Sequence, residues 1–415
     1  MLNLDSLKTA VAGEYAAIRR ITRLEPQGDK IFPPTYEGGE YADEPRQVQV
    51  EEVLRTSDGE RKVVSVRSVE TVLLDSVQSQ ANRMELALLR AYDAGRIRMP
   101  MLQVDFAGDG SDPILTEIRR ITALEAPHRM CDAIFRDAVW QDGKPFRDAG
   151  AGSRLNTATS ANATAVFELC PTALLFGFWD STGPRGGLGA KVQRAIVSEI
   201  VGYEKAEGKR TSSRIDPLQI ENNVDIYRKQ GGGWTFDPAL AEKDTKNEPV
   251  RLRPSEINHG NITPSFKQKD GSPNHGGVTV AYAMQHTVLS LAALRRLRFP
   301  VNGKSAADAD NAARTVLAAL GLAAICLLDE DGYDLRSRCL LDGKPGTFEF
   351  VGRGETKPFE LNAKVALELV AQTVAEAKKG GLPWPEEPVT LRPSGDLSKL
   401  VVESRRRSMS ATAGN

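Results

Sequence analysis

The chain has 415 residues, of which 40% are apolar, and a formal net charge of −1 at pH 7. This length and composition allow a substantial core in one large or two ordinary domains. No stretch approaches about eighteen uninterrupted apolar residues, and the N-terminus lacks a basic segment followed by an apolar one. We therefore expect a soluble, cytoplasmic protein without a membrane partner.

Cysteines and histidines are few and scattered, with no CxxC pair and no HxH or HExxH arrangement. This spacing indicates neither a zinc site nor a disulfide framework, and we expect no cofactor. Charge, by contrast, is segregated along the chain. Residues 37–60 hold eight acids against two arginines, whereas residues 251–300 hold seven cations against two acids. Such segregation permits a basic groove on a nearly neutral protein.

The N-terminal third predicts a helix or strand over 15–24, an acidic hairpin ending near Lys62, and a strand over 63–74. A helix follows from Asp75, with Asp75 or Ser76 as its cap. Its first half is rich in amides and hydroxyls, which suit either solvent or the sugar and phosphate oxygens of a nucleic acid. The residues singled out there are Ser76, Gln78, Asn82 and Arg83.

The middle of the chain predicts a helix over 126–140, a loop over 141–163, and a strand over 172–179. That last stretch is a near-continuous apolar run, which favours a strand buried on both faces. A glycine-rich loop over 183–189 follows. Val192, Ala195 and Ile200 have helical spacing, so we expect a helix over 189–202 with Lys191 and Arg194 on one face.

A glycine loop before a helix N-terminus suits an anion. The candidate contacts are Arg185, Gly187, Gly189, Lys191 and Arg194. A nucleotide-binding P-loop fails on spacing, because Ala190 separates Gly189 from Lys191 and Val192 stands where a Ser or Thr is needed. A plain glycine-rich turn and a phosphate-backbone contact both remain open. Asp180 fits a cap or turn better than a catalytic base.

The last part begins with a polar, turn-rich excursion over 203–250. It continues with a strand over 278–282, helices from Ser290 and over 306–320, and strands over 322–328, 333–341 and 347–351. A helix over 362–379 ends at Gly380, and a loose tail begins near Ser394. This order favours an α+β sheet with one face covered by helices and long insertions. No catalytic constellation can be assembled from it, so we expect no enzymatic activity.

Six segments together resemble one family, the RAMP-type backbone subunit of type I-G (formerly I-U) CRISPR Cascade complexes. They are FPPTY at 32–36, SVQSQANR at 76–83, TALLFGFWDSTG at 172–183, GAKVQRAIVSEIVG at 189–202, PSEINHGN at 254–261 and TVLSLAALRRLRF at 287–299. The resemblance spans roughly residues 15–340 and leaves the C-terminal helix and tail without a counterpart.

The resemblance implies one RRM-like (ferredoxin-like) palm over 1–393, with candidate fingers at 91–127 and a candidate thumb at 203–250. The flexible tail over 394–415 is predicted from its Arg/Ser-rich composition alone. It implies a non-catalytic subunit that polymerises along a CRISPR guide RNA and supports hybridisation of target DNA. The partners would be guide RNA, target DNA, further copies of the chain and other Cascade subunits. Tyr227 and Trp234 would be available to stack between bases. Two alternatives are a phosphate- or nucleotide-ligand enzyme using the Gly183–Gly189 loop and a self-assembling scaffold without RNA.

Overall fold

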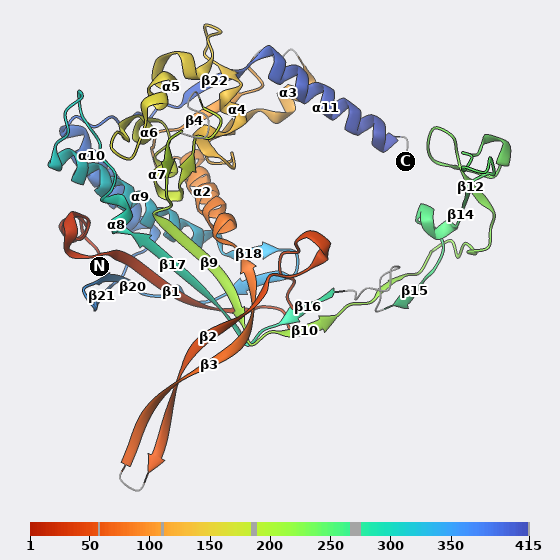
Figure 1. Cartoon of the computed structure of the whole chain (residues 1–415), viewed down its shortest axis with the longest axis horizontal. Coiled ribbons are helices and arrows are strands. Elements are labelled where there is room, and N and C mark those ends of the chain that lie inside the picture. The colour runs from red at the N-terminus through yellow and green to blue at the C-terminus, as the bar shows by residue number, and fades with distance from the viewer. Residues whose placement is uncertain (57–58, 109–111, 184–188, 266–274, 414–415) are drawn as a thin grey trace.

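The computed structural model describes residues 1–56, 59–108, 112–183, 189–265 and 275–413. Its body is built on a large antiparallel sheet of order β18-β19-β1-β17-β9-β3-β2, with β20 and β21 attached to β1 (Figure 1). The strands are β1 (Ala17–Pro26), β2 (Asp43–Thr56), β3 (Gly59–Asp75), β9 (Ile196–Tyr203), β17 (Tyr282–Ser290), β18 (Tyr333–Arg336), β19 (Cys339–Asp342), β20 (Phe348–Gly352) and β21 (Glu355–Phe359). The α+β class predicted from the sequence is confirmed.

Helices cover one face of this sheet. Along β17 every second side chain is buried, from Ala283 to Leu289, and the intervening ones are partly exposed. The buried face packs against α2 (Val77–Asp93) and α9 (Ala307–Asp331) in one hydrophobic cluster. With the other elements between them left aside, β1, α2, β9, β17, α9 and β20 come along the chain in the order β–α–β–β–α–β.

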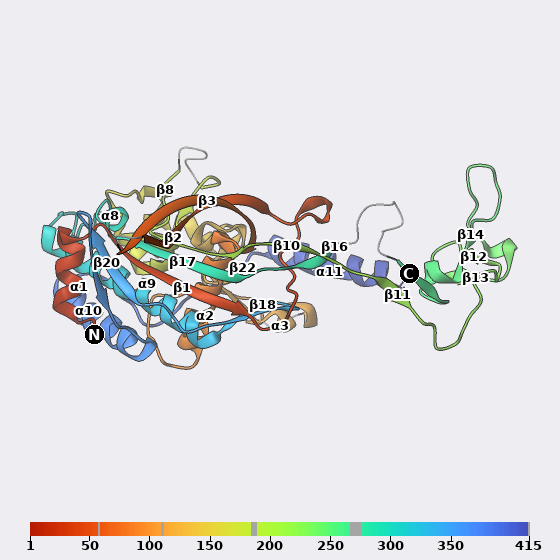
Figure 2. The ribbon, with the colours of Figure 1, turned by 90° about the horizontal axis from the view of Figure 1, so that it is seen from below.

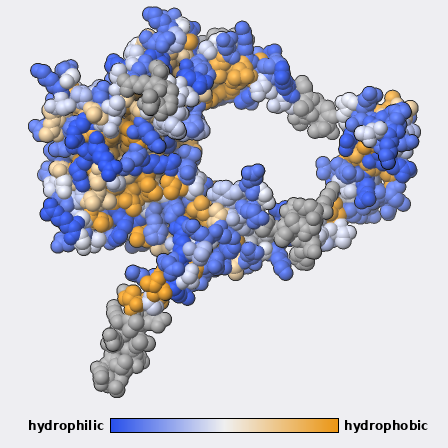
Figure 3. Space-filling view, viewed as in Figure 1, coloured by the Kyte–Doolittle hydropathy of each residue, from blue (hydrophilic) through white to orange (hydrophobic). Residues whose placement is uncertain are grey.

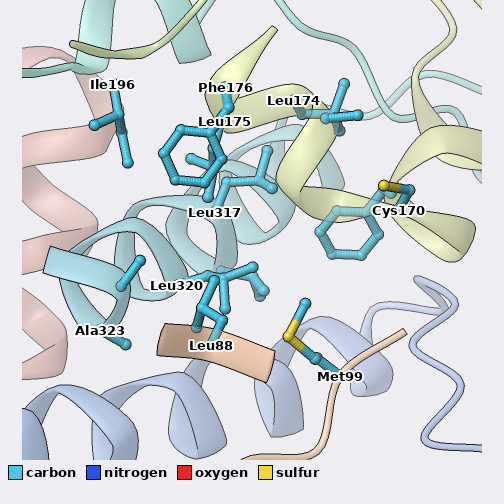
Figure 4. Packing of buried hydrophobic residues seen from close by; sticks show 14 of the residues in the cluster. Leu88, Met99, Cys170, Leu174, Leu175, Phe176, Ile196, Leu317, Leu320 and Ala323 are labelled. Atoms are coloured by element: carbon cyan, nitrogen blue, oxygen red, sulfur yellow. The ribbon is translucent and has the colours of Figure 1, made fainter. Parts of the chain in front are cut away.

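Helix α9 is the centre of the core. It is long and apolar enough to cross a bilayer, but 89% of its most apolar stretch is buried inside the body, as in the core helix of a soluble protein. Leu317 and Leu320 pack between Leu88 of α2 and Phe176 (Figure 4). On another side α9 packs along α10 (Ala363–Lys379), whose N-terminal cap Asn362 accepts a hydrogen bond from the Val365 N–H.

Two predicted elements around the glycine loop are wrong. The expected strand at 172–179 is mostly the helix α7 (Pro171–Phe176), followed by the short strand β7 (Phe178–Trp179). The expected helix at 189–202 is β8 (Lys191–Val192) and then the central strand β9. All six α7 residues are buried, so they show no helical period. The first half of β9 alternates between buried and more exposed side chains, and its β-branched residues favour a strand.

Two further expectations also fail. The predicted helix over 126–140 is broken into a 3-10 turn, α4 (Ala133–Arg136) and β6 (Ala138–Val139). The strand expected over 322–328 is the continuation of α9, which is buried all round through this stretch. The predicted strands of β3 and β20 and the helices α2 and α10 are confirmed. Residues 15–24, for which helix and strand both remained open, contribute to β1.

A second, smaller sheet has the order β5-β4-β22-β6. Besides β6, its strands are β4 (Leu102–Asp105), β5 (Arg120–Thr122) and β22 (Val389–Pro393). Residues 91–127, the predicted fingers, contribute β4, α3 (Pro113–Ile118) and β5 to this part of the body. Where we expected a loose tail, residues Gly395–Ala413 form the helix α11, which packs on α3.

Two extensions leave the body. Strands β2 and β3 continue as a two-stranded ribbon well beyond the point where β3 pairs with β9 (Figure 1). Between β9 and β17 the chain forms a long arm of successive ladders, which contains the excursion predicted at 203–250. Its strands are β10 (Ala206–Lys209) with β16 (His275–Thr279), β11 (Ser212–Arg214) with β15 (Ile262–Ser265), and β12 (Ile226–Arg228) with β13 (Trp234–Thr235) and β14 (Arg251–Leu252).

The arm and α11 leave the body on the same side (Figures 1 and 2). In the space-filling view they border a wide opening next to the body (Figure 3). The short helices α1 (Leu4–Thr9), α5 (Gly150–Arg154), α6 (Thr164–Leu169) and α8 (Leu291–Leu294) complete the body. The finger and thumb roles stay predictions.

Candidate nucleic-acid interface

The hairpin of β7 and β8 carries the glycine-rich loop and presents an aromatic ring beside a cation. Trp179 and Lys191 are paired across the two strands, and the Lys191 ammonium lies 5.4 Å from the centre of the Trp179 ring. Trp179 is 51% exposed, and Lys191 is also exposed. Arg185 and Gly187 lie outside the described residues, and Gly189 is half-buried at the start of the second strand.

The base of this loop is fixed by Asp180. The Asp180 carboxylate is buried and lies 2.5 Å from Nη2 of Arg147. The backbone N–H of Asp180 donates to the Ala190 carbonyl at 2.9 Å. A Cβ at Gly183 would lie within 2.6 Å of that carboxylate, so a side chain there would displace the ion pair. Asp180 is thus an anchor of the loop.

Arg194 does not share a face with Lys191, because the two lie on extended chain and not on a helix. Its side chain is half-buried against Gly177, where a Cβ would lie 3.0 Å from Cγ of Arg194. Burial lowers the pKa of Arg194, and the nearby Arg129 guanidinium lowers it further. The prediction that Arg194 and Lys191 form one contact face is therefore wrong.

Below the hairpin lies a buried ion pair. Arg129 donates to both carboxylate oxygens of Glu85, at 2.8 and 2.7 Å, and to the Gly177 carbonyl at 3.1 Å. Burial raises the pKa of Glu85 to about 7, and Arg129 opposes this rise. The pair ties α2 to the start of β7 and so positions the hairpin.

A groove of about 330 Å³ begins at Lys191 and runs along α8. Gln193 and Arg296 lie on its two sides, with Arg296 Nη1 donating to Gln193 Oε1 at 2.9 Å, and Ser160 adds a hydroxyl. Of the three arginines of the 295–298 run, Arg295 binds the carbonyls of Ala10, Val11 and Tyr15, and Arg298 pairs with Asp310. Of these three arginines, only Arg296 lines the groove. We call it the Lys191 groove.

Residues 19–206 match the family described as CRISPR-associated protein GSU0053. The chain is a CRISPR-associated protein. It therefore has a role in a CRISPR system. The match covers just under half of the chain and includes Trp179, Lys191 and Gln193, whereas Arg296 and α11 lie beyond it. No curated protein matches the chain.

The α2 residues predicted from the sequence divide into two groups in this CRISPR-associated protein. Gln78 and Asn82 are exposed and free to meet a ligand. Ser76 caps α2 by accepting from the Ser79 N–H at 3.2 Å, and Arg83 binds Asp75 at 3.0 Å and the Leu335 carbonyl at 2.6 Å. Ser76 and Arg83 thus have structural partners, and none of the four lines the Lys191 groove.

Sequence reasoning missed a buried polar network under the sheet. Gln80 of α2 donates to Asp75 at 2.6 Å and accepts from Ser198 at 3.0 Å and from Gln285 at 2.9 Å. The network continues from Gln285 through the Tyr333 hydroxyl and Arg20 to Asp329. The amide-rich start of α2 was its signal, because one amide in that run faces inward.

The two aromatic residues predicted to stack on bases lie at the end of the arm. Trp234 is 43% exposed and packs edge-on against Phe236, with ring centres 5.3 Å apart. Tyr227 is half-buried in β12, opposite Thr235 and Arg251. Base stacking by either residue stays a prediction. Among the described residues, no group of three or more His, Cys, Asp and Glu is placed to hold a metal ion.

Proposed function

We propose that this CRISPR-associated protein is a non-catalytic backbone subunit of a type I-G Cascade complex, whose copies line up along a guide RNA and support hybridisation of target DNA. The membership in a CRISPR system and the resemblance of the six sequence segments support this role. The β–α–β–β–α–β order of the large sheet supports an RRM-like palm. The arm between β9 and β17 supports an inserted thumb.

The Lys191 groove is the observation that carries the proposal. It combines two cations, an amide and a hydroxyl with the exposed ring of Trp179 at its edge. Cations and amides suit phosphate and sugar oxygens, and an exposed aromatic ring suits a stacked base of any identity. Binding through such groups is largely independent of sequence, which is what a subunit that repeats along a guide requires.

Replacement of both groove cations tests this role. The double variant Lys191→Ala, Arg296→Ala should bind single-stranded RNA more weakly, and the slope of log K against log salt should fall by about 1.4, or about 0.7 for each lost phosphate contact. Both residues are solvent-facing, so the free energy of unfolding should change by less than about 0.5 kcal/mol per substitution.

The matched control is Lys357→Ala with Lys364→Ala, which removes two exposed cations from β21 and α10. It should leave the salt slope unchanged. A folded groove variant with wild-type RNA affinity would remove the Lys191 groove from the interface.

Absence of catalysis is part of the same proposal. Asp180, the acid of the glycine loop, is committed to Arg147 and cannot act as a free base while that pair is intact. The purified protein should neither hydrolyse ATP nor cleave RNA with added Mg²⁺. ATP turnover that disappears on Lys191→Ala would instead support a nucleotide-ligand enzyme using the Gly183–Gly189 loop.

A further inference from the structure

The end of the arm leaves several large apolar side chains exposed. We call residues 215–262 the arm head; its strands have two or three residues each. Sheets this small are marginal in water without further packing. Trp234, Phe236 and Leu240 are 43%, 65% and 52% exposed within seven residues of sequence. A cluster of exposed large apolar side chains marks a surface that packs against a partner.

The charge of the arm head favours a protein partner over a nucleic acid. The head carries eight Asp and Glu residues against six Lys and Arg residues. Nucleic-acid binding surfaces carry an excess of cations, because their affinity comes largely from phosphate contacts. Asp237 follows Phe236 directly, which places a carboxylate beside the aromatic pair. A matching partner would offer an apolar groove with a cationic rim.

The body of the same chain has such a groove. It lies between α10 and the 95–98 segment, has a volume of about 380 Å³, and is named here the α10 groove. Leu367, Val370, Ala371 and Val374 form its apolar wall. This volume falls within the roughly 300–1,000 Å³ typical of pockets that enclose a ligand.

Cations edge the α10 groove. Arg96, Arg98 and Lys378 line it, and all three are exposed. Glu386 pairs with Lys378 at 2.6 Å, and Arg96 pairs with Glu330 at 2.8 Å. The rim therefore keeps an excess of positive charge, which complements the acidic arm head.

A chain cannot place its arm head in its own groove. The arm leaves one end of the body and α10 lies at the other end along the longest axis (Figure 1). We propose that Trp234 and Phe236 of one copy dock into the α10 groove of the next. Contacts between two different surfaces of a molecule generate head-to-tail assemblies, which are open chains unless the rotation between copies closes a ring. This inference deepens the proposed function, on which it rests, by naming the surfaces through which copies of the subunit join.

Engineered cysteines test the contact directly. Under mild oxidation, a mixture of Phe236→Cys and Ala371→Cys chains should form a covalent dimer. A single chain that carries both substitutions should form a ladder of covalent multimers. The mixture of Phe236→Cys and Lys357→Cys, with the second cysteine on β21, is the matched control and should stay uncross-linked. The reactions are run on RNA-free protein and on protein assembled on a guide RNA, and absence of the dimer in both would overturn the proposal.

A second measurement uses the groove side, where substitutions on an exposed helix surface spare the fold. Ala371→Glu adds a negative charge to the groove wall and should weaken self-association at least tenfold in sedimentation velocity. Gln372→Glu adds the same charge at the neighbouring exposed position of α10, outside the groove, and should change it less than twofold. Equal effects of the two variants would overturn the proposal.

The arm variant separates this inference from nucleic-acid binding. Phe236→Ala with Leu240→Ala should weaken self-association and leave the affinity for a short RNA that holds one copy unchanged. Unchanged association with at least tenfold weaker RNA binding would overturn the inference and make the arm head an RNA contact. Failure of the proposed function has another signature, namely wild-type RNA affinity in the Lys191→Ala, Arg296→Ala variant.

Discussion

At the scale of single residues, Glu85 couples the stability of the protein to pH. Burial raises its pKa from the ordinary value of 4.5 to about 7, so between these values the folded chain holds a proton that the unfolded chain releases. The free energy of unfolding should therefore decrease as pH rises through this window, by up to about 1.4 kcal/mol per pH unit from this group.

The variant Glu85→Gln should lack this dependence, because the amide has no proton to lose. Chemical denaturation at several pH values between about 5 and 8 measures the difference between the two proteins. Parallel pH profiles for wild type and Glu85→Gln would contradict the assignment.

Arg129→Met should destabilise the fold above pH 7 by about 3–5 kcal/mol, because it leaves a buried carboxylate without its cation.

Gln80 and Gln78 offer a matched pair on one helix. Gln80→Leu removes one buried hydrogen bond each from Asp75, Ser198 and Gln285, and unsatisfied buried groups cost about 1–3 kcal/mol. Gln78→Leu changes an exposed residue and should stay within about 0.5 kcal/mol. The denaturation midpoints of the two variants check this. Similar midpoints would mean that the network adds little to stability.

At the scale of elements, α11 should be held by its apolar face and not by its arginines. Arg405 and Arg406 pair with Glu117 and Asp112 in exposed bridges of 3.4 and 3.1 Å, each of which contributes about 0–1 kcal/mol. Val401 and Val402 pack against the main hydrophobic cluster.

Limited proteolysis should therefore distinguish two variants of α11. Val401→Asp with Val402→Asp should make the helix a protease target, and Arg405→Ala with Arg406→Ala should leave its cleavage rate within about twofold of wild type. Faster cleavage in the arginine variant would show that the bridges hold the helix.

The elements that could be predicted are those with one buried face. Helix α10, with its Asn362 cap and terminal lysines, and strand β3, with alternating side chains, both follow from pattern. Helices α7 and α9 are enclosed on all sides, so their apolar runs carry no period and were assigned wholly or partly to strands. Val192, Ala195 and Ile200 have helical spacing by coincidence, and the pairing of β9 with β17 and β3 decides the conformation.

The candidate site was predicted in part for the same reason. The role of Lys191 stays a prediction, and the cation that lies beside it depends on the conformation of residues 191–196. On a helix that cation would be Arg194. On extended chain Arg194 turns inward, and Arg296 comes from the turn that follows α8, about a hundred residues away along the chain. Trp179 ends an apolar run that predicts a buried strand. Its exposure follows only from its position in the β7–β8 hairpin.

At the scale of the whole molecule, the body should fold without most of the arm. None of the three hydrophobic clusters contains a described residue from 210–274. Lys209 and His275 are paired across the base of the arm, so an Asn-Gly turn can join them after excision of the intervening residues.

The shortened protein should unfold within a few degrees of the full chain and should lose self-association while it keeps short-RNA binding. Thermal denaturation and sedimentation velocity on the same sample measure both properties. A shortened chain that aggregates or melts much earlier would show that the arm supports the body.

Strand β22 gives the protein a dependence on the order of its synthesis. It lies between β4 and β6 in the second sheet, parallel to β4, although it follows β4 by nearly three hundred residues. Until residues 389–393 leave the ribosome, the edges of β4 and β6 that face β22 are unpaired. Unpaired strand edges favour aggregation and leave the chain open to proteases. A nascent chain that stalls before β22 therefore keeps the edges of β4 and β6 exposed. We expect cellular proteases to remove such a chain before it can join an assembly of complete copies.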